Sequence, residues 1–337
     1  MKKVLREITL DLVRVTEAAA LVSSLQLGRG DKEAVDRAAV DAMRGMLDYI
    51  PMRATVVIGE GEKDKAPMLY IGEKVGTWEA DSPEYDIAVD PVDGTRLVAY
   101  GLSNAISVLA AAEKGAITYL PTFYSWKLAV GPELAGKLDL NLSITENLRR
   151  ASEVLGVKIS EITVVVLNRD RHRDIIEEIR SAGARIKLIS DGDVAAAIAT
   201  AIPESGVDIY MGIGGSPEAI LAAAALRCLG GEMQLRLWPH SREEKEKVLS
   251  DGYDLERIYR TEELVSGEDV VFVATGITSG DFLKGVRYMR DKVITESIAM
   301  RARSRTVRKI TAYHDVKHKH VPLKSRGGDV SFFELQR

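Results

Sequence analysis

The sequence contains few of the features that mark secreted, membrane-spanning or nucleic-acid-binding proteins. Its 337 residues include one cysteine, Cys228, which excludes an intrachain disulfide and indicates a reducing compartment. No apolar run approaches the length of a transmembrane helix, and charges at helical spacing near the N-terminus argue against a signal peptide. We therefore expect a cytoplasmic protein that has no contact with a membrane.

The chain also lacks an excess of positive charge. Its formal net charge is −4, whereas nucleic-acid binding needs a concentrated basic surface. One basic stretch, at 317–319, is expected to belong to a solvated tail over 316–337. A composition of 46% hydrophobic and 28% charged residues is typical of a globular protein. These features favour a small-molecule partner and argue against a nucleic acid.

The residues from Asp86 to Thr95 form an apolar run that leads into a turn. Residues 87–89 are expected to form a short buried strand that Pro91 ends. Gly94 permits the backbone to turn into a following helix, with Thr95 in its first turn. The pattern predicts a corner at the carboxyl end of a strand, where open α/β sheets bind their ligands.

This corner carries three oxygen-bearing side chains, those of Asp90, Asp93 and Thr95. Oxygen ligands on a rigid turn suit a hard cation such as Mg²⁺ or Mn²⁺, and a helix N-terminus suits a phosphate. A covalent-aspartate phosphatase of the haloacid-dehalogenase type would need an aspartate two residues before Asp93, where this chain has Pro91. The spacing therefore favours two ligands on one turn and predicts metal-assisted phosphate chemistry.

Further acidic positions lie upstream of the corner. Asp36 continues the apolar stripe of a helix expected over 31–48, and a buried carboxylate needs a partner. This position is equally compatible with a metal ligand and with a structural role, either a salt bridge or an exposed first turn. The stretch Gly59-Glu60-Gly61-Glu62 follows a strand expected at 55–58. It is either a solvated acidic loop or a group of carboxylates around a cation, and the nearby aspartates favour the cation.

The second half of the chain alternates strands and helices. Strands are expected at 162–167, 185–189 and 207–211, and a helix is expected after each of them. This alternation predicts a mostly parallel sheet with right-handed crossovers. A polar stretch at 131–141 is expected to separate the two halves of the chain.

A polar motif follows each of these strands, and the three motifs are predicted to line one sheet edge that faces the substrate: Arg171-His172-Arg173, Asp191-Gly192-Asp193 and Gly212 to Glu218. Two arginines at a helix start are unfavourable unless an anion such as a sugar phosphate binds them. One aspartate of the second motif can cap a helix, and the other is free for sugar hydroxyls. Glu218 suits either a helix-dipole contact or a ligand role, and Pro217 argues against a dinucleotide fingerprint.

Together these motifs resemble a known family. Asp90-Pro91-Val92-Asp93-Gly94-Thr95 with Gly59-Glu60-Gly61-Glu62 is similar to the metal site of the lithium-sensitive sugar phosphatase superfamily, which includes inositol monophosphatases and fructose bisphosphatases. The wider set resembles bacterial class II fructose-1,6-bisphosphatases, through Gly28-Arg29-Gly30-Asp31-Lys32, the stretch from Ala66 to Gly76 and Gly212-Ile213-Gly214-Gly215. The resemblance runs from about residue 5 to about residue 312.

The resemblance implies a layered α-β-α-β-α sandwich of the α/β class. It implies a metal-binding half over 1–135, a sugar-binding half over 142–315 and the tail. The implied reaction is the hydrolysis of the 1-phosphate of fructose 1,6-bisphosphate, a step of gluconeogenesis, by a homo-oligomer. Sedoheptulose 1,7-bisphosphate is an alternative substrate, and an inositol phosphatase or a sugar-phosphate sensor without catalysis are further alternatives.

The resemblance also implies roles for individual residues. Two or three Mg²⁺ or Mn²⁺ ions would be bound by Asp36, Glu60, Asp90, Asp93 and Glu218. Glu62 or Thr95 would orient or deprotonate the attacking water. The 6-phosphate would be held by Arg171 and Arg173. The full set of substrate contacts would be Asp93, Gly94, Thr95, Tyr124, Arg171, His172, Arg173, Asp191, Gly192, Asp193 and Gly215.

Overall fold

The structure is a computed structural model, and it describes residues 5–60 and 69–336 apart from the side chain of Arg6. The chain divides into two compact units, Met1–Ile117 with Gly267–Arg337, and Thr118–Ser266. The division expected at 131–141 therefore lies elsewhere, after residue 117 and again after residue 266. The physical reason is that strands from the last part of the chain complete the sheet of the first unit.

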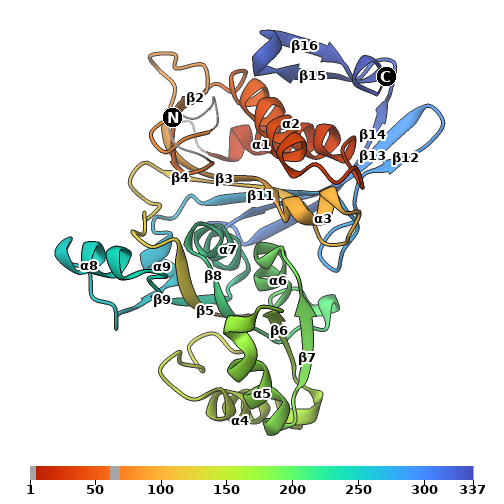
Figure 1. Cartoon of the computed structure of the whole chain (residues 1–337). Coiled ribbons are helices and arrows are strands. Elements are labelled where there is room, and N and C mark those ends of the chain that lie inside the picture. The colour runs from red at the N-terminus through yellow and green to blue at the C-terminus, as the bar shows by residue number, and fades with distance from the viewer. Residues whose placement is uncertain (1–4, 61–68, 337) are drawn as a thin grey trace. The chain divides into compact units, whose positions relative to one another are not determined.

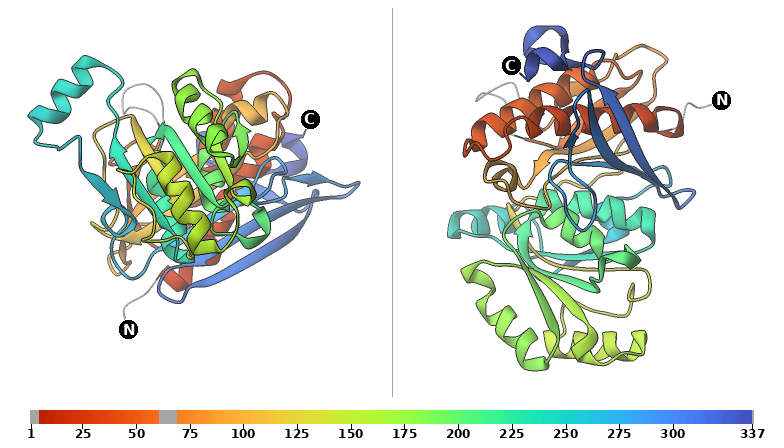
Figure 2. Two further views of the ribbon diagram at one scale, coloured as in Figure 1. Left: turned by 90° about the horizontal axis from the view of Figure 1, so that it is seen from below. Right: turned by 90° about the vertical axis from the view of Figure 1, so that its right-hand side faces the viewer.

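The first unit is built on an eight-stranded mixed sheet in the order β12-β13-β11-β4-β3-β1-β2, with β14 paired to β13. Its strands are β1 (Arg53–Ile58), β2 (Lys74–Val75), β3 (Glu84–Asp93), β4 (Ile106–Glu113), β11 (Val271–Gly276), β12 (Arg287–Tyr288), β13 (Lys292–Arg301) and β14 (Thr306–Asp315). Helices α1 (Leu5–Ser24) and α2 (Lys32–Leu47) cover one face of this sheet (Figures 1 and 2). A short helix, α3 (Thr95–Ala99), follows β3.

Helix α2 begins where the sequence predicts. The Asp31 carboxylate accepts a hydrogen bond from the Ala34 N–H at 2.9 Å, which satisfies one of the free amides of the first turn. The apolar side of the helix, including Val35, Ala39 and Met43, is buried with α1 against the sheet. Asp36 follows Val35 and is half-buried, so the helix fixes the direction in which this carboxylate points.

The C-terminal residues do not form the solvated tail that the sequence predicts. They fold into β15 (His320–Leu323), η4 (Lys324–Arg326), β16 (Gly328–Ser331) and α10 (Phe332–Leu335), and β15 pairs antiparallel with β16. This C-terminal hairpin lies on the side of α1 and α2 away from the sheet (Figures 1 and 2). The prediction is wrong because alternating apolar residues close a second core there: Ala18, Leu21, Val22, Ala42, Val293, Val316, Val321, Leu323, Val330 and Phe332.

The second unit is built on a six-stranded sheet in the order β10-β9-β5-β8-β6-β7. Its strands are β5 (Tyr124–Val130), β6 (Thr163–Leu167), β7 (Arg185–Ile189), β8 (Ile209–Gly215), β9 (Glu232–Leu237) and β10 (Ile258–Arg260). Among the described strands of this sheet, only the β6–β7 and β6–β8 pairs are parallel. The prediction of a mostly parallel sheet is therefore wrong, because β5, β9 and β10 join the sheet in antiparallel pairs.

The predicted alternation of strands and helices is confirmed in this unit. Helices α5 (Arg173–Ala182), α6 (Asp193–Ala199) and α7 (Ser216–Leu229) follow β6, β7 and β8, and α4 (Ile144–Leu155) packs beside α5. Two more helices, α8 (Arg242–Ser250) and α9 (Thr261–Leu264), follow β9 and β10. Helices lie on both faces of the sheet (Figure 1). Both units thus combine mixed sheets with packed helices, which confirms the expected α/β class.

None of the described helices is long and apolar enough to cross a membrane.

Candidate active site

The acidic corner of the first unit lies on a strand that continues through its proline. Strand β3 extends from Glu84 to Asp93, so Pro91 does not end it as the sequence predicts. Asp90 pairs with Val108 of β4 and Asp93 with Ile106, and the register shifts between these two pairs. A proline fits at such a bulge because its missing N–H is not needed by the ladder. The bulge carries Asp90 and Asp93 at the end of the strand.

Gly94 turns the chain out of this strand. Its φ of 91° lies in the left-handed region that glycine adopts without strain, and Thr95 is the first residue of α3. These predictions are confirmed. Helix α3 has only five residues, so its dipole is small, and the groups that matter at this corner are the side chains.

Asp36 of α2 meets the corner through Thr95. The Thr95 Oγ1 donates a hydrogen bond of 2.6 Å to Asp36 Oδ1, although the two residues are 59 positions apart. Burial raises the pKa of the Asp36 carboxyl, and the Thr95 hydrogen bond and the charge of Lys32 oppose that rise. Among the described residues, the partner of Asp36 is this neutral hydroxyl and not a salt-bridge cation, and the carboxylate is half-buried.

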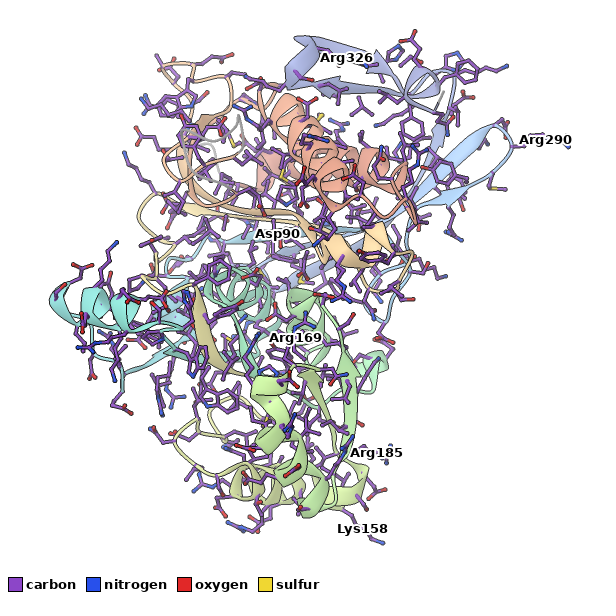
Figure 3. The ribbon with its side chains drawn as sticks, in the orientation of Figure 1. Asp90, Lys158, Arg169, Arg185, Arg290 and Arg326 are labelled. Carbon is purple, nitrogen blue, oxygen red and sulfur yellow. The ribbon has the colours of Figure 1, made fainter. Side chains whose placement is uncertain are left out.

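Asp90 is oriented from within its own turn. Its Oδ1 accepts a hydrogen bond of 3.0 Å from the Val92 N–H, and it is half-buried on β3 (Figure 3). Asp93 is 4% exposed. Two carboxylates are thus held close along one short stretch of backbone, an arrangement that a cation stabilises and that repulsion opposes without one.

Glu60 follows β1. Of the predicted acidic motif over 59–62, the structure describes Gly59 and Glu60. Its N–H donates to the Leu69 carbonyl at 2.9 Å. A Cβ on Gly59 would lie 2.0 Å from the same carbonyl oxygen, so glycine is required there for the backbones to approach. Gly61 and Glu62 lie outside the described residues.

In the second unit, the three polar motifs meet at one end of the parallel strands, as predicted. Arg171 donates to the Ile213 carbonyl through Nε at 3.2 Å and through a terminal nitrogen at 2.9 Å. Its guanidinium lies 4.8 Å from the centre of the Tyr124 ring. Tyr124 begins β5, which pairs with the end of β8. Arg171 and Tyr124 therefore form one surface from two strand ends.

His172 belongs to the fold of this edge. Its Nδ1 lies 2.6 Å from the Leu167 carbonyl oxygen, and its Nε2 accepts the Ile213 N–H at 2.7 Å. Burial lowers the pKa of His172, which keeps the ring neutral with the proton on Nδ1. Both ring nitrogens are occupied, so this side chain has no nitrogen left for a substrate.

The sequence predicts that Arg171 and Arg173 bind one phosphate, but the two side chains have different partners. Arg173 is exposed and lies 3.4 Å from Asp170 on the same turn. Arg169, which is not among the predicted site residues, donates to Asp191 Oδ1 at 2.7 Å from just beyond β6 (Figure 3). The other Asp191 oxygen, Oδ2, is buried and has no hydrogen-bond partner among the described residues. The signal for Arg169 was its position immediately after a predicted strand.

The glycines at the end of β8 make room for side chains. A Cβ on Gly212 would lie 3.3 Å from the His172 ring, one on Gly214 would lie 2.1 Å from Asp193 Oδ2, and one on Gly215 would lie 1.8 Å from Glu218 Oε2. These glycines form the end of β8, directly before α7, and an imidazole and two carboxylates pack against them.

Glu218 in the first turn of α7 has an oxygen available for a ligand. Its Oε2 is buried and has no hydrogen-bond partner among the described residues. Burial and the charge of Asp193 raise the pKa of Glu218, whereas Lys127 lowers it. An orphaned buried carboxylate oxygen is costly, and either a proton or a bound cation relieves this cost.

Across the described parts of the chain, no three His, Cys, Asp or Glu side chains are gathered closely enough to hold a metal ion. The oxygen donors of each unit nevertheless suit a hard divalent cation. In the first unit, Asp36, Asp90 and Asp93 supply carboxylate oxygens around the β3 corner. In the second unit, taken by itself, Glu218 has a buried oxygen without a hydrogen-bond partner among the described residues. Oxygen donors of this kind suit Mg²⁺ or Mn²⁺.

Comparison with known proteins agrees with this chemistry. The family model described as bacterial fructose-1,6-bisphosphatase, glpX-encoded, matches residues 6–314. The class 2 fructose-1,6-bisphosphatase of Haemophilus influenzae is 47% identical over 92% of this chain and 96% of its own. The fructose-1,6-bisphosphatase 1 class 2 of Escherichia coli is 43% identical over 93% and 97%. The Thermosynechococcus vestitus protein named D-fructose 1,6-bisphosphatase class 2/sedoheptulose 1,7-bisphosphatase is 45% identical over 91% and 95%.

These matches define first a class of enzyme, the phosphoric monoester hydrolases, to which this chain belongs. More narrowly, the chain is a member of the bacterial class 2 fructose-1,6-bisphosphatase family. The family is one of metal-dependent phosphatases. The resemblance drawn from the sequence motifs is thereby confirmed.

Proposed function

We propose that the chain hydrolyses the 1-phosphate of fructose 1,6-bisphosphate and releases fructose 6-phosphate and inorganic phosphate. Family membership over residues 6–314 supports the substrate. The observation that carries the chemistry is the hydrogen bond between Thr95 and Asp36, at 2.6 Å. It joins a hydroxyl and a carboxylate from two helices beside the Asp90–Asp93 bulge.

In this proposal the carboxylates Asp36, Glu60, Asp90, Asp93 and Glu218 bind two or three divalent ions, Mg²⁺ or Mn²⁺. When bound, such ions neutralise the charge of the phosphoryl group and lower the pKa of a coordinated water. Phosphate monoesters hydrolyse very slowly without a catalyst, so this neutralisation has to provide much of the acceleration. The half-buried position of Asp36 and the buried Oε2 of Glu218 favour tight binding of a cation.

Thr95 orients the attacking water. Because its hydroxyl proton is directed to Asp36, the Thr95 oxygen is available to accept a hydrogen bond from water. Asp36, a cation ligand in this proposal, holds the Thr95 hydroxyl in that orientation. Glu62, which lies outside the described residues, is the base that takes the water proton in the proposal.

The second unit holds the sugar. Arg171, stacked on Tyr124, binds the 6-phosphate, and Gly192 and Gly215 allow the sugar to approach the backbone. The unpartnered Oδ2 of Asp191 accepts a hydrogen bond from a sugar hydroxyl, with Arg169 fixing the carboxylate. Arg173 is left with a peripheral role because it pairs with Asp170.

Sedoheptulose 1,7-bisphosphate is a second candidate substrate. The observation that favours it is the name of the Thermosynechococcus vestitus relative, which includes both bisphosphatase activities. The two sugars differ by one hydroxymethylene between the phosphates, so the same cations and the same arginine can serve both.

The test is phosphate release from fructose 1,6-bisphosphate, sedoheptulose 1,7-bisphosphate and inositol 1-phosphate, each with Mn²⁺, with Mg²⁺ and with EDTA. We expect metal-dependent release from the first, weaker or equal release from the second and none from the third. Asp90→Asn should lower kcat by about 10³-fold or more, because a ligand charge at the reacting phosphoryl group is lost. Asp11→Asn, a change at a surface carboxylate paired with Arg14, is the matched control with unchanged activity.

Two outcomes would contradict the proposal. One is full, Mn²⁺-dependent activity in a folded Asp90→Asn protein. The other is preferential hydrolysis of inositol 1-phosphate, which would move the substrate from a ketose bisphosphate to another member of the sugar phosphatase superfamily.

A further inference from the structure

A lysine is buried at the centre of the polar cluster in the second unit. Lys127 is 1% exposed and lies on β5, where it pairs with Gly212 of β8. Its Nζ is 2.9 Å from Asp193 Oδ2. A lysine in the interior of an apolar strand is costly unless its charge is compensated, so this ion pair accounts for the placement of both residues.

The Asp193 carboxylate is held on its interior side. Besides Lys127, the hydroxyl of Tyr210 donates to the same Oδ2 at 2.9 Å, and Asp193 is 7% exposed. Tyr210 is itself fully buried. Asp193 is the first residue of α6, so these two contacts fix the turn that carries Asp191 and Gly192. The carboxylate that the sequence assigns to the sugar is therefore part of an interior network.

Glu218 packs against the same end of β8. The neighbouring glycines Gly214 and Gly215 leave the space for Asp193 and Glu218, respectively, so two carboxylates occupy adjacent positions. Lys127 neutralises one of them. The other, Glu218, keeps a buried oxygen without a hydrogen-bond partner among the described residues. The cluster thus contains two carboxyl groups and one ammonium group, and that ammonium group is bonded to Asp193.

We propose that Lys127 is a positioning residue for Glu218: it occupies the Asp193 carboxylate, so that Glu218 alone of the pair is free to bind a divalent cation. This inference rests on the proposed function of Glu218 as a metal ligand. Lys127 is buried and bonded to Asp193, so it acts through that carboxylate. It acts by neutralising the Asp193 carboxylate, which would otherwise repel the Glu218 carboxylate, and by holding the turn beside it.

The test is a double-mutant cycle on the full-length protein, read out by calorimetric titration of the metal-free protein with Mn²⁺ in the absence of substrate. Lys127→Met removes the cation and keeps the length of the side chain. We expect its Mn²⁺ affinity at the Glu218 site to fall by about 10- to 100-fold, the range for partners of metal ligands. In Lys127→Met/Asp193→Asn the released carboxylate is also neutralised, and we expect the affinity to return to within about threefold of wild type.

Two variants define the site and the background. Glu218→Gln should lose the same binding event outright, which identifies the Glu218 step in the titration. Lys324→Met, which removes an exposed lysine paired with Asp48 in the other unit, should bind Mn²⁺ as wild type does. Tyr210→Phe removes the second donor to Asp193 and should weaken binding by about threefold, as expected for a single hydrogen bond.

Wild-type Mn²⁺ affinity in a folded Lys127→Met protein would overturn the inference, and so would a double variant that binds as weakly as Lys127→Met. If Lys127→Met does not fold, restored folding and affinity in the double variant support the inference. If neither folds, unchanged affinity in Tyr210→Phe rejects it, and the threefold loss supports it. The Mn²⁺ affinities of wild type and the two Lys127 variants could follow the expected pattern while the wild-type protein releases no phosphate. That result would refute the proposed function and leave the role of Lys127 intact.

Discussion

At the scale of single residues, several polar side chains serve the interior of the molecule. His172 uses both ring nitrogens on backbone groups, and Asp193 is held by Lys127 and Tyr210. These two residues follow predicted strand ends, which is why the sequence assigns them to the substrate. Of their neighbours, Arg171 is exposed, and Asp191 Oδ2 has no hydrogen-bond partner in the described part of the chain. Arg171 and Asp191 are therefore better candidates for ligand contacts.

His314 offers a test of burial at this scale. Its Nε2 lies 2.9 Å from Thr295 Oγ1, and burial, followed by the charge of Lys319, lowers the pKa of His314 to about 4. The unfolded state binds this proton at a higher pH than the folded state, so stability is lost as pH falls from about 6.5 toward 4. We expect the contribution to be on the order of 1 kcal/mol at pH 5.

The measurement is the free energy of unfolding by urea at pH 7 and pH 5 for His314→Gln and wild type. The variant should lose less stability on acidification than wild type does. His320→Gln, at an exposed position, is the matched control and should follow wild type. Burial raises the pKa of Glu17 nearby, which acts in the opposite direction but equally in both proteins. An identical loss in His314→Gln and wild type would refute the assignment.

At the scale of elements, two local rules gave the wrong answer for reasons that the structure makes clear. Pro91 was expected to end β3, but the register shift beside it removes the need for its N–H. The C-terminal residues were expected to be solvated because of their lysines and histidines, but their apolar residues alternate and close a core on α1 and α2. Pro322 approaches α2 so closely that a Cβ on Gly45 would lie 2.4 Å from its carbonyl oxygen.

The adjacent phenylalanines of the C-terminal hairpin test whether this contact stabilises the protein. Phe332 is fully buried, whereas Phe333 is 41% exposed. Phe332→Ala should lower the free energy of unfolding by about 3 kcal/mol or more, because it leaves a cavity between the hairpin and the helices. Phe333→Ala should cost less than about 1 kcal/mol. Thermal and urea unfolding measure both, and equal effects would mean that the hairpin is not packed as described.

At the scale of the whole molecule, the two units differ in how the chain builds them. The second unit is one continuous segment, Thr118–Ser266, and its core of residues from β5, β6, β8, α4 and α5 lies entirely within that segment. The first unit is discontinuous, because β11, β13 and β14 come from the last part of the chain.

This difference predicts the behaviour of fragments. Residues 118–266 expressed alone should fold cooperatively, with a sharp thermal transition and dispersed amide resonances. Residues 1–117 alone should not, because β4 would lose its β11 neighbour and α1 its contacts with β11 and β13. The control is co-expression of 1–117 with 267–337, which supplies the missing strands. A folded 1–117 fragment would show that the late strands are not needed for this core.

The sequence by itself determined the family, the α/β class and the acidic corner. These depend on short-range patterns: a strand, a glycine with positive φ, and carboxylates at fixed spacing from them. The tertiary structure decided which side chains share a site. Asp36 meets Thr95 across 59 positions, Lys127 meets Asp193 across 66, and the first sheet is completed by strands that follow residue 267. Such contacts arise from the packing of distant segments, and no local pattern specifies them, because burial and charge compensation depend on neighbours that only the folded chain supplies.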